Sequence, residues 1–290
     1  MQRIIATLFL SHMILMAASA VAAPDAEKDL AKGNDRFVVY YSDKAPVKEF
    51  KSFQLAVLDA GHHPDLLPLK EEGKTLLGYI SLGEVRKSDP LFTTLSSRHL
   101  ILQENPNWKD SFYVDVRDPF WVKTVLEDIV PSALRQGFDG LFLDTLDDPI
   151  ALEDKDHGKY PGMNDAAVHL VEAIRMHYPS IKIMMNRGYS ILPKVASAID
   201  FELGESVYAG YNFDKKSYTK VSADNYQLQV KLLQEAKQKN PELKIYSLDY
   251  ADPADDDAIK EIYKTERANG FTPYVATIGL DRVIPEPESP

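Results

Sequence analysis

Acidic side chains stand at the ends of several short apolar segments in this sequence. Asp144 directly follows the segment 140–143, and Glu205 stands two residues after the apolar run 199–203. Two carboxyl groups that face each other across a groove can cleave a glycosidic bond, because one protonates the leaving oxygen while the other attacks the anomeric carbon or activates water. The two residues are therefore candidates for a catalytic pair, although Asp144 could instead cap the helix that follows it.

Glu202 is an alternative to Glu205, because it lies in the run 199–203 that Glu205 follows. The two residues are three positions apart, so an extended strand that continued through both would direct their side chains to opposite faces. Only one of them can then point into a shared site. In that case we expect the other to be a partnered acid in the wall of the fold.

A wider set of polar and aromatic residues occupies similar positions, at or near the ends of apolar segments. So many acids would repel one another unless a ligand or a function uses them, and tyrosine can both stack on a ring and donate a hydrogen bond. Any single acid could equally cap a loop or form a surface ion pair. The residues that we predict to bind substrate are Tyr41, Asp59, Tyr79, Glu84, Asp115, Arg117, Asp147, Asn186, Arg187, Tyr208 and Asp249.

The adjacent histidines His62 and His63 raise the question of a metal site. Neighbouring side chains on an extended backbone point apart, and no H-x-H or H-E-x-x-H spacing occurs elsewhere in the chain. The motifs G-x-S-x-G, G-x-G-x-x-G and Walker A are also missing. We therefore predict no metal and no cofactor. A metal-dependent hydrolase would require one of these histidines to converge with Asp59 and Asp144.

The candidate residues must be positioned by the elements in which they stand. Nine short apolar runs alternate with helical patterns, which is typical of a parallel sheet covered on both faces. Eight such units make an α/β fold of the TIM type, a (β/α)₈ barrel whose reacting groups project from the carboxyl ends of the strands; a doubly wound sheet is the alternative. One strand is surplus, and the last run has no obvious place. The runs are 37–41, 55–59, 76–80, 112–116, 140–144, 181–186, 199–203, 245–249 and 274–278.

The longest helical pattern between these runs begins at Asp118-Pro119 and ends before Gly137. Proline favours the first helical position and glycine the position after the last, so a helix is predicted here. Pro131 lies inside this pattern and should kink or shorten the helix, because proline has no N–H to donate.

The chain of 290 residues contains 33 Lys and Arg against 44 Asp and Glu, a formal net charge of −11. This charge repels phosphate backbones, so we expect no nucleic acid partner and favour a neutral or cationic ligand. The sequence has no cysteine, so we expect no disulfide and no lipid attached through cysteine. We expect the protein to be a monomer.

The first residues have the pattern of a cleaved secretory signal: Arg3, an apolar run too short to span a bilayer comfortably, and small residues up to Ala22. We predict a signal peptide over 1–22, a polar lead over 23–35, the barrel domain over 36–283 and a disordered tail over 284–290. The protein would then be secreted or periplasmic, with no membrane association after cleavage; a retained membrane anchor is the alternative.

Four segments in order along the chain carry a resemblance to a known family. They are LLGYISLGE (76–84), FDGLFLDTLD (138–147), NRG (186–188) and ESVY (205–208). Together they resemble glycoside hydrolase family 114, the endo-α-1,4-polygalactosaminidases, in a bacterial exported subgroup, over about residues 36–280. The resemblance implies a barrel that cleaves α-1,4-linked galactosamine polymers, often partly de-acetylated, without a metal and with retention of anomeric configuration.

The resemblance also implies roles for individual residues. The last aspartate of the family's D-G-x-x-x-D strand falls on Asp144, as the nucleophile, and the glutamate after its D-F/W-x-x-x-E strand falls on Glu205, as the acid/base. A polymer with free amines is cationic, so an acidic protein would attract it. The acids available to its ammonium groups would be Asp59, Glu84, Asp115 and Asp249, and the tyrosines available to its sugar rings would be Tyr41, Tyr79, Tyr208 and Tyr211.

Two other functions stay open at this point. The first is a glycan-binding barrel of the extracellular matrix that no longer cleaves its ligand, although both candidate carboxylates are present. The second is the metal-dependent hydrolase considered above, which a measurement of metal content would separate from a two-carboxylate enzyme.

Overall fold

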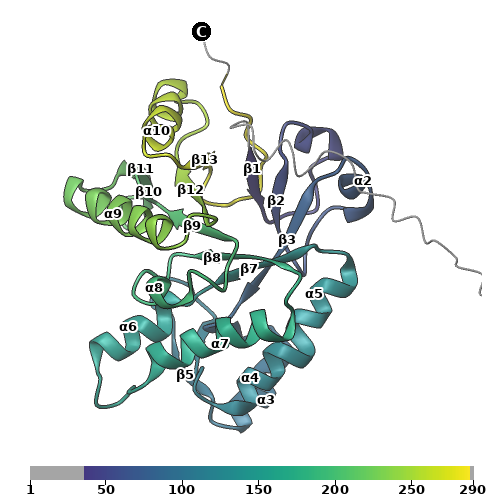
Figure 1. Cartoon of the computed structure of the whole chain (residues 1–290), viewed down its shortest axis with the longest axis vertical. Coiled ribbons are helices and arrows are strands. Elements are labelled where there is room, and N and C mark those ends of the chain that lie inside the picture. Colours follow the sequence, from purple (N-terminus) through teal and green to yellow (C-terminus); the bar gives the residue numbers. More distant parts are fainter. Residues whose placement is uncertain (1–35, 288–290) are drawn as a thin grey trace, which may run out of the picture.

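In the computed structural model, which describes residues 36–287, eight parallel strands form one sheet that curves into a nearly closed barrel (Figure 1). Each strand in this sheet pairs in parallel with the next one along the sheet. The predicted TIM-type barrel is therefore confirmed. Its strands are β1 (Phe37–Tyr40), β2 (Leu55–Asp59), β3 (Thr75–Ser81), β7 (Gly140–Asp144), β8 (Lys182–Asn186), β9 (Phe201–Glu205), β12 (Lys244–Tyr250) and β13 (Thr272–Ala276).

The surplus strand is not the one that the sequence left without a place. The run 274–278 falls largely in β13, the last strand of the barrel, whereas the run 112–116 contributes to β6 (Ser111–Val114). Strand β6 pairs antiparallel with β4 (Glu84–Arg86) and β5 (Ile101–Glu104) in a separate sheet inserted between β3 and β7. A second insertion follows β9, the antiparallel hairpin of β10 (Ala209–Asn212) and β11 (Ser217–Lys220).

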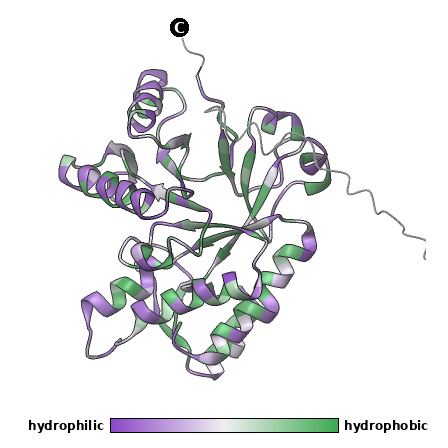
Figure 2. Ribbon diagram, viewed as in Figure 1, coloured by the Kyte–Doolittle hydropathy of each residue, from purple (hydrophilic) through white to green (hydrophobic). Residues whose placement is uncertain are grey.

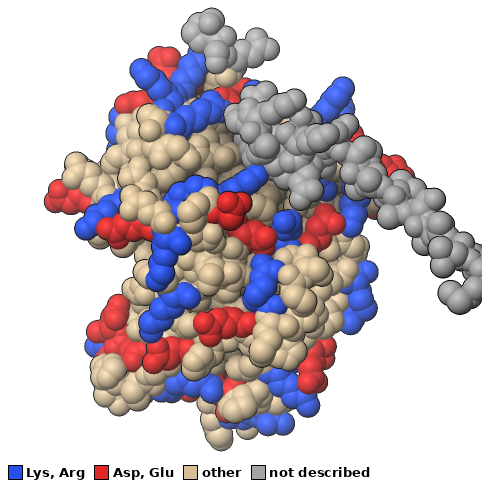
Figure 3. Space-filling view, in the orientation of Figure 1, with Lys and Arg blue, Asp and Glu red and all other residues tan. Residues whose placement is uncertain are grey.

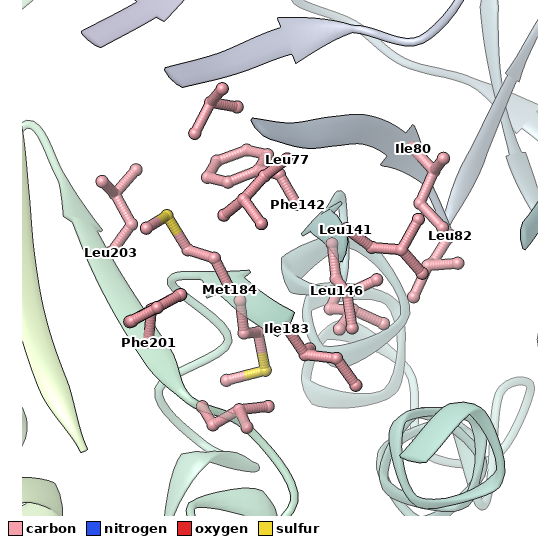
Figure 4. Packing of buried hydrophobic residues seen from close by; sticks show 14 of the residues in the cluster. Leu77, Ile80, Leu82, Leu141, Phe142, Leu146, Ile183, Met184, Phe201 and Leu203 are labelled. Carbon is pink, nitrogen blue, oxygen red and sulfur yellow. The ribbon is translucent and has the colours of Figure 1, made fainter. Parts of the chain in front are cut away.

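Aromatic side chains fill the barrel where its two edge strands meet. The ring of Phe37 in β1 contacts Tyr274 in β13 and Tyr246 in β12, at centroid distances of 5.7 and 4.8 Å. Beyond the end of β1, the N–H of Tyr41 donates to the carbonyl of Leu280 at 2.7 Å and ties the edges together. Figure 4 shows the packing of buried side chains from β3, β7, β8 and β9 in the same continuous core.

Helices surround the sheet, and most of them present an apolar side to it and a polar side to solvent (Figures 1 and 2). A 3₁₀ turn at Val47–Phe50 and a π-helical turn at Val125–Ile129 complete the helical elements of the described residues. The α-helices are α2 (Leu66–Glu71), α3 (Leu91–Ser97), α4 (Pro119–Thr124), α5 (Val130–Gln136), α6 (Asp147–Lys155), α7 (Met163–His177), α8 (Leu192–Val195), α9 (Ala223–Lys239) and α10 (Asp256–Ala268).

The helix predicted over 118–136 begins and ends close to its predicted limits. The Asp118 side chain accepts from the N–H of Phe120, and Gly137 ends the helix with φ of +109°. The π-helical turn between α4 and α5 lies just before Pro131. Because proline cannot donate to the carbonyl four residues earlier, the wider turn absorbs the interruption, and the helical path continues.

We expect Gly140→Ala to prevent the pairing of β7 with β8. A Cβ at Gly140 would lie 1.9 Å from the carbonyl oxygen of Lys182, with which Gly140 pairs in the sheet. Backbone cannot rotate away as a side chain can, so unfolding free energy should fall by at least about 3 kcal/mol. Gly158→Ala is the control, because its Cβ would meet its nearest neighbour at an ordinary 3.4 Å. Equal thermal unfolding midpoints for the two variants would contradict the prediction.

The ends of the chain relate differently to the predicted segments. The predicted signal peptide and polar lead, 1–22 and 23–35, lie outside the described residues. In the described part of the predicted tail, Ile284 donates its N–H to the Tyr274 hydroxyl, and Glu286 pairs with Arg267 and Arg36. Residues 288–290 lie outside the described residues, and disorder of the tail stays a prediction. Within residues 36–287, no helix is both long and apolar enough to cross a membrane.

Candidate active site

Three neighbouring strands of the barrel bring Asp144, Asn186 and Glu205 together at their carboxyl ends. These residues end β7, β8 and β9, which are adjacent in the sheet. The amide nitrogen of Asn186 donates to Asp144 Oδ1 at 2.9 Å and to Glu205 Oε2 at 2.7 Å. Both oxygens lie one hydrogen bond from the same nitrogen, so their separation cannot exceed the combined length of these two bonds. The predicted pair is thus assembled, with Asn186 between its members.

Glu205 rather than Glu202 faces this site. In β9, Leu203 and Glu205 share the inner face of the barrel, while Glu202 lies on the outer face. Glu202 is 0% exposed, and its carboxyl oxygens have no hydrogen-bond partner among the described residues. Burial therefore raises the pKa of Glu202 well above its usual value, and the repulsive charge of Asp147 adds to this. Glu202 is an acid of the barrel wall, as the strand alternation predicts, but without the expected partner.

A strained residue follows each of the three site residues. Thr145, Arg187 and Ser206 come directly after Asp144, Asn186 and Glu205, and their φ angles are +64°, +54° and +54°. Left-handed φ is uncommon outside glycine, and a β-branched threonine there is an outlier. Such strain persists only where surrounding contacts over-determine the backbone, and it concentrates at functional sites. The sharp turns end each strand just beyond its reactive side chain.

Hydrogen bonds from the neighbouring loop hold Thr145 in this conformation. Its hydroxyl oxygen accepts from the N–H groups of Leu82 and Gly83 at 3.1 and 2.8 Å, and it lies 2.8 Å from Ser81 Oγ. The loops approach so closely that a Cβ at Gly83 would lie 2.1 Å from the carbonyl oxygen of Thr145. The loop after β3 is thereby fixed against the strand end that carries Asp144.

Burial and a neighbouring charge set the protonation of Asp144. Burial in the barrel mouth, followed by the charge of Glu205, raises the pKa of Asp144 to about 6, against hydrogen bonds from Asn186, Thr145 and Tyr79 that lower it. Tyr79 stands beside Tyr41, with ring centroids 5.0 Å apart, and both face the carboxylates. Burial raises the pKa of each tyrosine well above its usual value, so both hydroxyls stay protonated and can donate.

Tyr250 is a site residue that the sequence reasoning missed. Its hydroxyl donates to Glu205 Oε1 at 2.6 Å, so the carboxylate of Glu205 accepts one bond on each oxygen. Burial and the charge of Glu205 raise the pKa of Tyr250 well above its usual value. The available signal was strand alternation: β12 extends to Tyr250, which shares the inner face with Leu248, whereas Asp249 between them faces outward.

Asp147 and Arg187 form an ion pair near the candidate carboxylates Asp144 and Glu205. Arg187 Nε lies 2.9 Å from Asp147 Oδ2, and Asp147 Oδ1 accepts from the N–H of Gly188 at 2.8 Å. The pair links the loop after β7 to the loop after β8. Burial raises the pKa of Asp147, and the guanidinium of Arg187 opposes this shift. Both residues are partly exposed, so these predicted substrate-binding side chains remain accessible from solvent.

Two of the predicted ammonium-binding acids are buried anchors for the insertions. Asp249 is 0% exposed, and Asp249 Oδ1 accepts from the N–H groups of Tyr208 and Ala209 at 2.8 Å each, at the start of the hairpin β10–β11. Glu84 is also buried, and its two oxygens accept from Asn105 Nδ2 and Ser111 Oγ. Both carboxylates are buried and bond to an insertion, Asp249 to the hairpin β10–β11 and Glu84 to the inserted sheet.

Other predicted substrate-binding residues have bonding partners outside the pair. Asp115 and Arg117 bind each other at 2.7 Å, and Arg117 also donates to the carbonyl of Pro161, because β6 belongs to the inserted sheet rather than to the barrel. The Tyr208 hydroxyl donates to Glu261 at 2.7 Å. Asp59 does end a barrel strand, but its carboxylate accepts from the N–H of Gly61 at 2.7 Å.

A further acid that was not singled out, Asp148, interacts with Glu84 and with Asp144. Burial, then the charge of Glu84 and a hydrogen bond with it, raise the pKa of Asp148 to about 9, with smaller effects from Asp144 and Asp147. Asp148 is therefore protonated at neutral pH and can donate to Glu84. Sharing one proton lets this crowded part of the site avoid two adjacent negative charges.

The two adjacent histidines do not converge with the carboxylates. His62 Nε2 lies 3.1 Å from Asp43, whereas His63 contacts the carbonyl of Pro64 and the side chain of Gln136. Within residues 36–287, no group of three or more His, Asp or Glu side chains has the arrangement of a metal site. The opposite orientation of the histidines agrees with the expectation for neighbours on an extended backbone.

Known proteins share both the sequence pattern and the fold. Residues 17–289 match glycoside-hydrolase family GH114. The glycoside hydrolase domain of PelA from Pseudomonas aeruginosa is 24% identical, with a TM-score of 0.76 over 85% of this chain and 96% of that one. Aspergillus fumigatus Ega3, crystallised in complex with galactosamine, is 13% identical, with a TM-score of 0.63 over 86% and 93%.

A sequence relative is also found in Deinococcus radiodurans. This uncharacterized protein is 25% identical over 225 residues, which cover 73% of this chain and 67% of the relative. The family match extends over nearly the whole chain. The chain belongs to glycoside-hydrolase family GH114.

Proposed function

We propose that this protein is an exported glycosidase that acts on α-1,4-linked, galactosamine-containing polysaccharide. It would cleave internal bonds of the polysaccharide by a retaining mechanism. The observation that carries the proposal is the bridged pair of carboxylates, with one Asn186 nitrogen bonded to both Asp144 and Glu205. Family membership supports glycosidic hydrolysis, and export is proposed from the pattern of residues 1–22.

The separation of the two carboxylates supports retention. Retaining enzymes have carboxyl groups about 5 to 5.5 Å apart, whereas inverting enzymes need roughly 6.5 to 9.5 Å to admit a water molecule. Two bonds of 2.9 and 2.7 Å to a shared nitrogen bring the nearest oxygens of Asp144 and Glu205 below the inverting range. In this mechanism Asp144 attacks the anomeric carbon while Glu205 protonates the leaving oxygen and later activates water.

Galactosamine is proposed as the sugar because of the family and because of the ligand held by Ega3, a structural relative. The charge of the chain is compatible with a cationic polymer, although Figure 3 shows basic and acidic side chains interspersed on the face that it draws. Attraction would therefore come chiefly from the partly buried acids of the site, Asp144, Asp147 and Glu205. Added salt should weaken binding of the polymer only partly, because partly buried charges are screened much less than exposed ones.

The pH profile should report which role Asp144 plays. If Asp144 is the nucleophile, it must be ionised, and kcat/KM should fall as the pH drops through its pKa of about 6. Tyr79→Phe removes a hydrogen bond that lowers this pKa, so the acidic limb should move to higher pH. Tyr178→Phe is the control, because its hydroxyl donates to Leu126 elsewhere. A profile that instead falls as pH rises through 6 would identify Asp144 as the general acid.

The proposed reaction can be tested on defined oligosaccharides. Purified protein would be incubated with partly de-acetylated α-1,4-galactosamine oligomers and, separately, with glucosamine oligomers, and products would be weighed by mass spectrometry. We expect internal cleavage of the galactosamine series, and the first product observed by NMR should have the α configuration. Binding without cleavage would favour a non-catalytic glycan-binding barrel. Loss of activity on removal of bound metal would favour a metal-dependent hydrolase.

A further inference from the structure

The two insertions of the barrel carry exposed aromatic residues whose rings touch. Trp108 lies in the loop between β5 and β6, and Phe213 directly follows β10 at the turn of the hairpin. Their ring centroids are 5.4 Å apart, with an edge-to-face angle of 78°. The two residues are 53% and 49% exposed, and they are the aromatic members of the small set of large hydrophobic residues exposed within 36–287. Exposed apolar patches of this kind mark binding surfaces more often than chance.

Both insertions begin beside the catalytic pair. The N–H of Leu82 donates to the carbonyl of Asp144 at 3.0 Å, and β4 begins two residues later. The hairpin begins a few residues after Glu205. Along the chain, the inserted sheet lies between β3 and β7, and the hairpin lies between β9 and β12. The ring contact therefore joins the two insertions that flank the strands bearing Asp144, Asn186 and Glu205.

Buried carboxylates anchor the two insertions that carry Trp108 and Phe213. Asn105 and Ser111 stand on either side of the Trp108 loop, and both donate to Glu84. Asp249 accepts two backbone N–H groups at the base of the hairpin. Within the hairpin, the ring of Tyr211 contacts Phe213, at a centroid distance of 5.3 Å. The aromatic pair is thus presented on anchored loops, which reduces the entropy lost when a ligand orders it.

We propose that Trp108 and Phe213 form a sugar-binding platform for a part of the substrate chain beyond the bond that is cleaved. The inference rests on the proposed function, since its occupant is a residue of the same amino-sugar polymer. The C–H face of a hexosamine packs on an aromatic ring, and its ammonium group is attracted to the ring face. The insertions that carry the two rings begin next to the strand ends of Asp144 and Glu205, and we expect one polymer chain to reach both the carboxylates and the rings.

A platform of this kind makes affinity depend on chain length. Only oligomers long enough to reach both the catalytic pair and the aromatic pair gain its contacts. Trp108→Ala should therefore raise KM about tenfold for long oligomers, as expected for the loss of a stacking and cation–π contact, and leave short oligomers unchanged. Trp108→Phe should restore much of this affinity, since a flat ring is retained.

Tryptophan fluorescence can report occupancy of the platform without any cleavage. The sequence contains two tryptophans, and the other, Trp121, is 1% exposed with its indole N–H bonded to Leu82. Long galactosamine oligomers should therefore quench or shift emission from Trp108 and protect it from acrylamide, and Phe213→Ala should weaken this response. Leu67→Ala, an exposed apolar truncation on α2, is the matched control and should change neither fluorescence nor KM.

The outcomes separate the platform from the proposed reaction. If the wild-type protein cleaves long oligomers while Trp108 emission and the KM of Trp108→Ala stay unchanged, the platform is refuted and the reaction stands. If oligomers protect Trp108 without being cleaved, the platform stands and the reaction fails. If long oligomers are neither cleaved nor protect Trp108, both the reaction and the platform are refuted. A Trp108→Ala variant that turns over oligomers of every length faster would show that the pair acts as a gate, which also overturns the platform.

Discussion

Asp144→Asn should nearly abolish turnover of galactosamine oligomers. The amide has almost the shape of the carboxyl group but cannot ionise, so it cannot form the covalent glycosyl intermediate of a retaining enzyme. We expect kcat to fall by at least about 10⁴-fold, the upper end of what acid–base assistance contributes. Oligomer binding should be largely retained, because the site keeps Asn186 and its flanking tyrosines. Steady-state kinetics and a binding titration measure the two effects separately.

Chemical rescue by azide can identify Asp144 as the nucleophile, which the loss of turnover in Asp144→Asn alone does not. In Asp144→Ala, azide can enter the space of the carboxylate and attack the anomeric carbon directly. An α-linked substrate should then give the β-glycosyl azide, with part of the rate restored. Asp257→Asn, an exposed replacement on α10, controls for the loss of one negative charge and should retain normal kcat. Near-native turnover in Asp144→Asn would remove Asp144 from the catalytic pair.

Glu205→Gln should lower kcat on natural oligomers by about 10² to 10⁴-fold. The variant cannot protonate the leaving oxygen, while its amide can still occupy the place between Asn186 and Tyr250. The loss should be much smaller for an aryl glycoside whose leaving group needs no proton. Azide should rescue Glu205→Ala through the covalent intermediate, so the product would be the α-glycosyl azide. Opposite azide configurations from the two variants would assign both roles in one experiment.

Glu202→Gln is the matched control for this replacement. Glu202 lies on the same strand and faces outward, and burial raises its pKa well above the usual value, so the neutral glutamine is a close mimic of a side chain whose charged form is disfavoured. Its replacement by glutamine should therefore preserve both folding and kcat. A large loss of kcat in Glu202→Gln, together with normal activity in Glu205→Gln, would transfer the catalytic assignment to Glu202.

The sequence by itself determined the barrel and the catalytic candidates. Apolar runs alternating with helical patterns report burial on both faces, which is a local property of each segment. A parallel barrel gathers the carboxyl ends of its strands at one end. Asp144, Asn186 and Glu205 could therefore be expected together from their positions at the ends of such runs, and alternation along β9 favoured one inward acid of two.

Only the tertiary structure decided which runs belong to the barrel and where each strand ends. The segment around β6 has the same composition as a barrel strand but pairs antiparallel in the inserted sheet, because an apolar run records burial and not its partner. For this reason Asp115 and Arg117 bind each other away from the catalytic pair. Strand β12 extends one residue beyond the predicted run, so Tyr250 on the inner face meets Glu205, while Asp249 on the outer face anchors a hairpin.

The electrostatics and the aromatic pair also depend on contacts between distant segments. The pKa of Asp144 rises because the fold buries it and places Glu205 on the second strand along. Trp108 and Phe213 meet because two insertions, each unremarked in the sequence, reach toward one another from opposite sides of the catalytic strands. The local sequence shows which residues are polar, aromatic or expected to be buried. The distances between side chains of different strands, on which the proposed chemistry depends, are set only when the sheet places those strands next to one another.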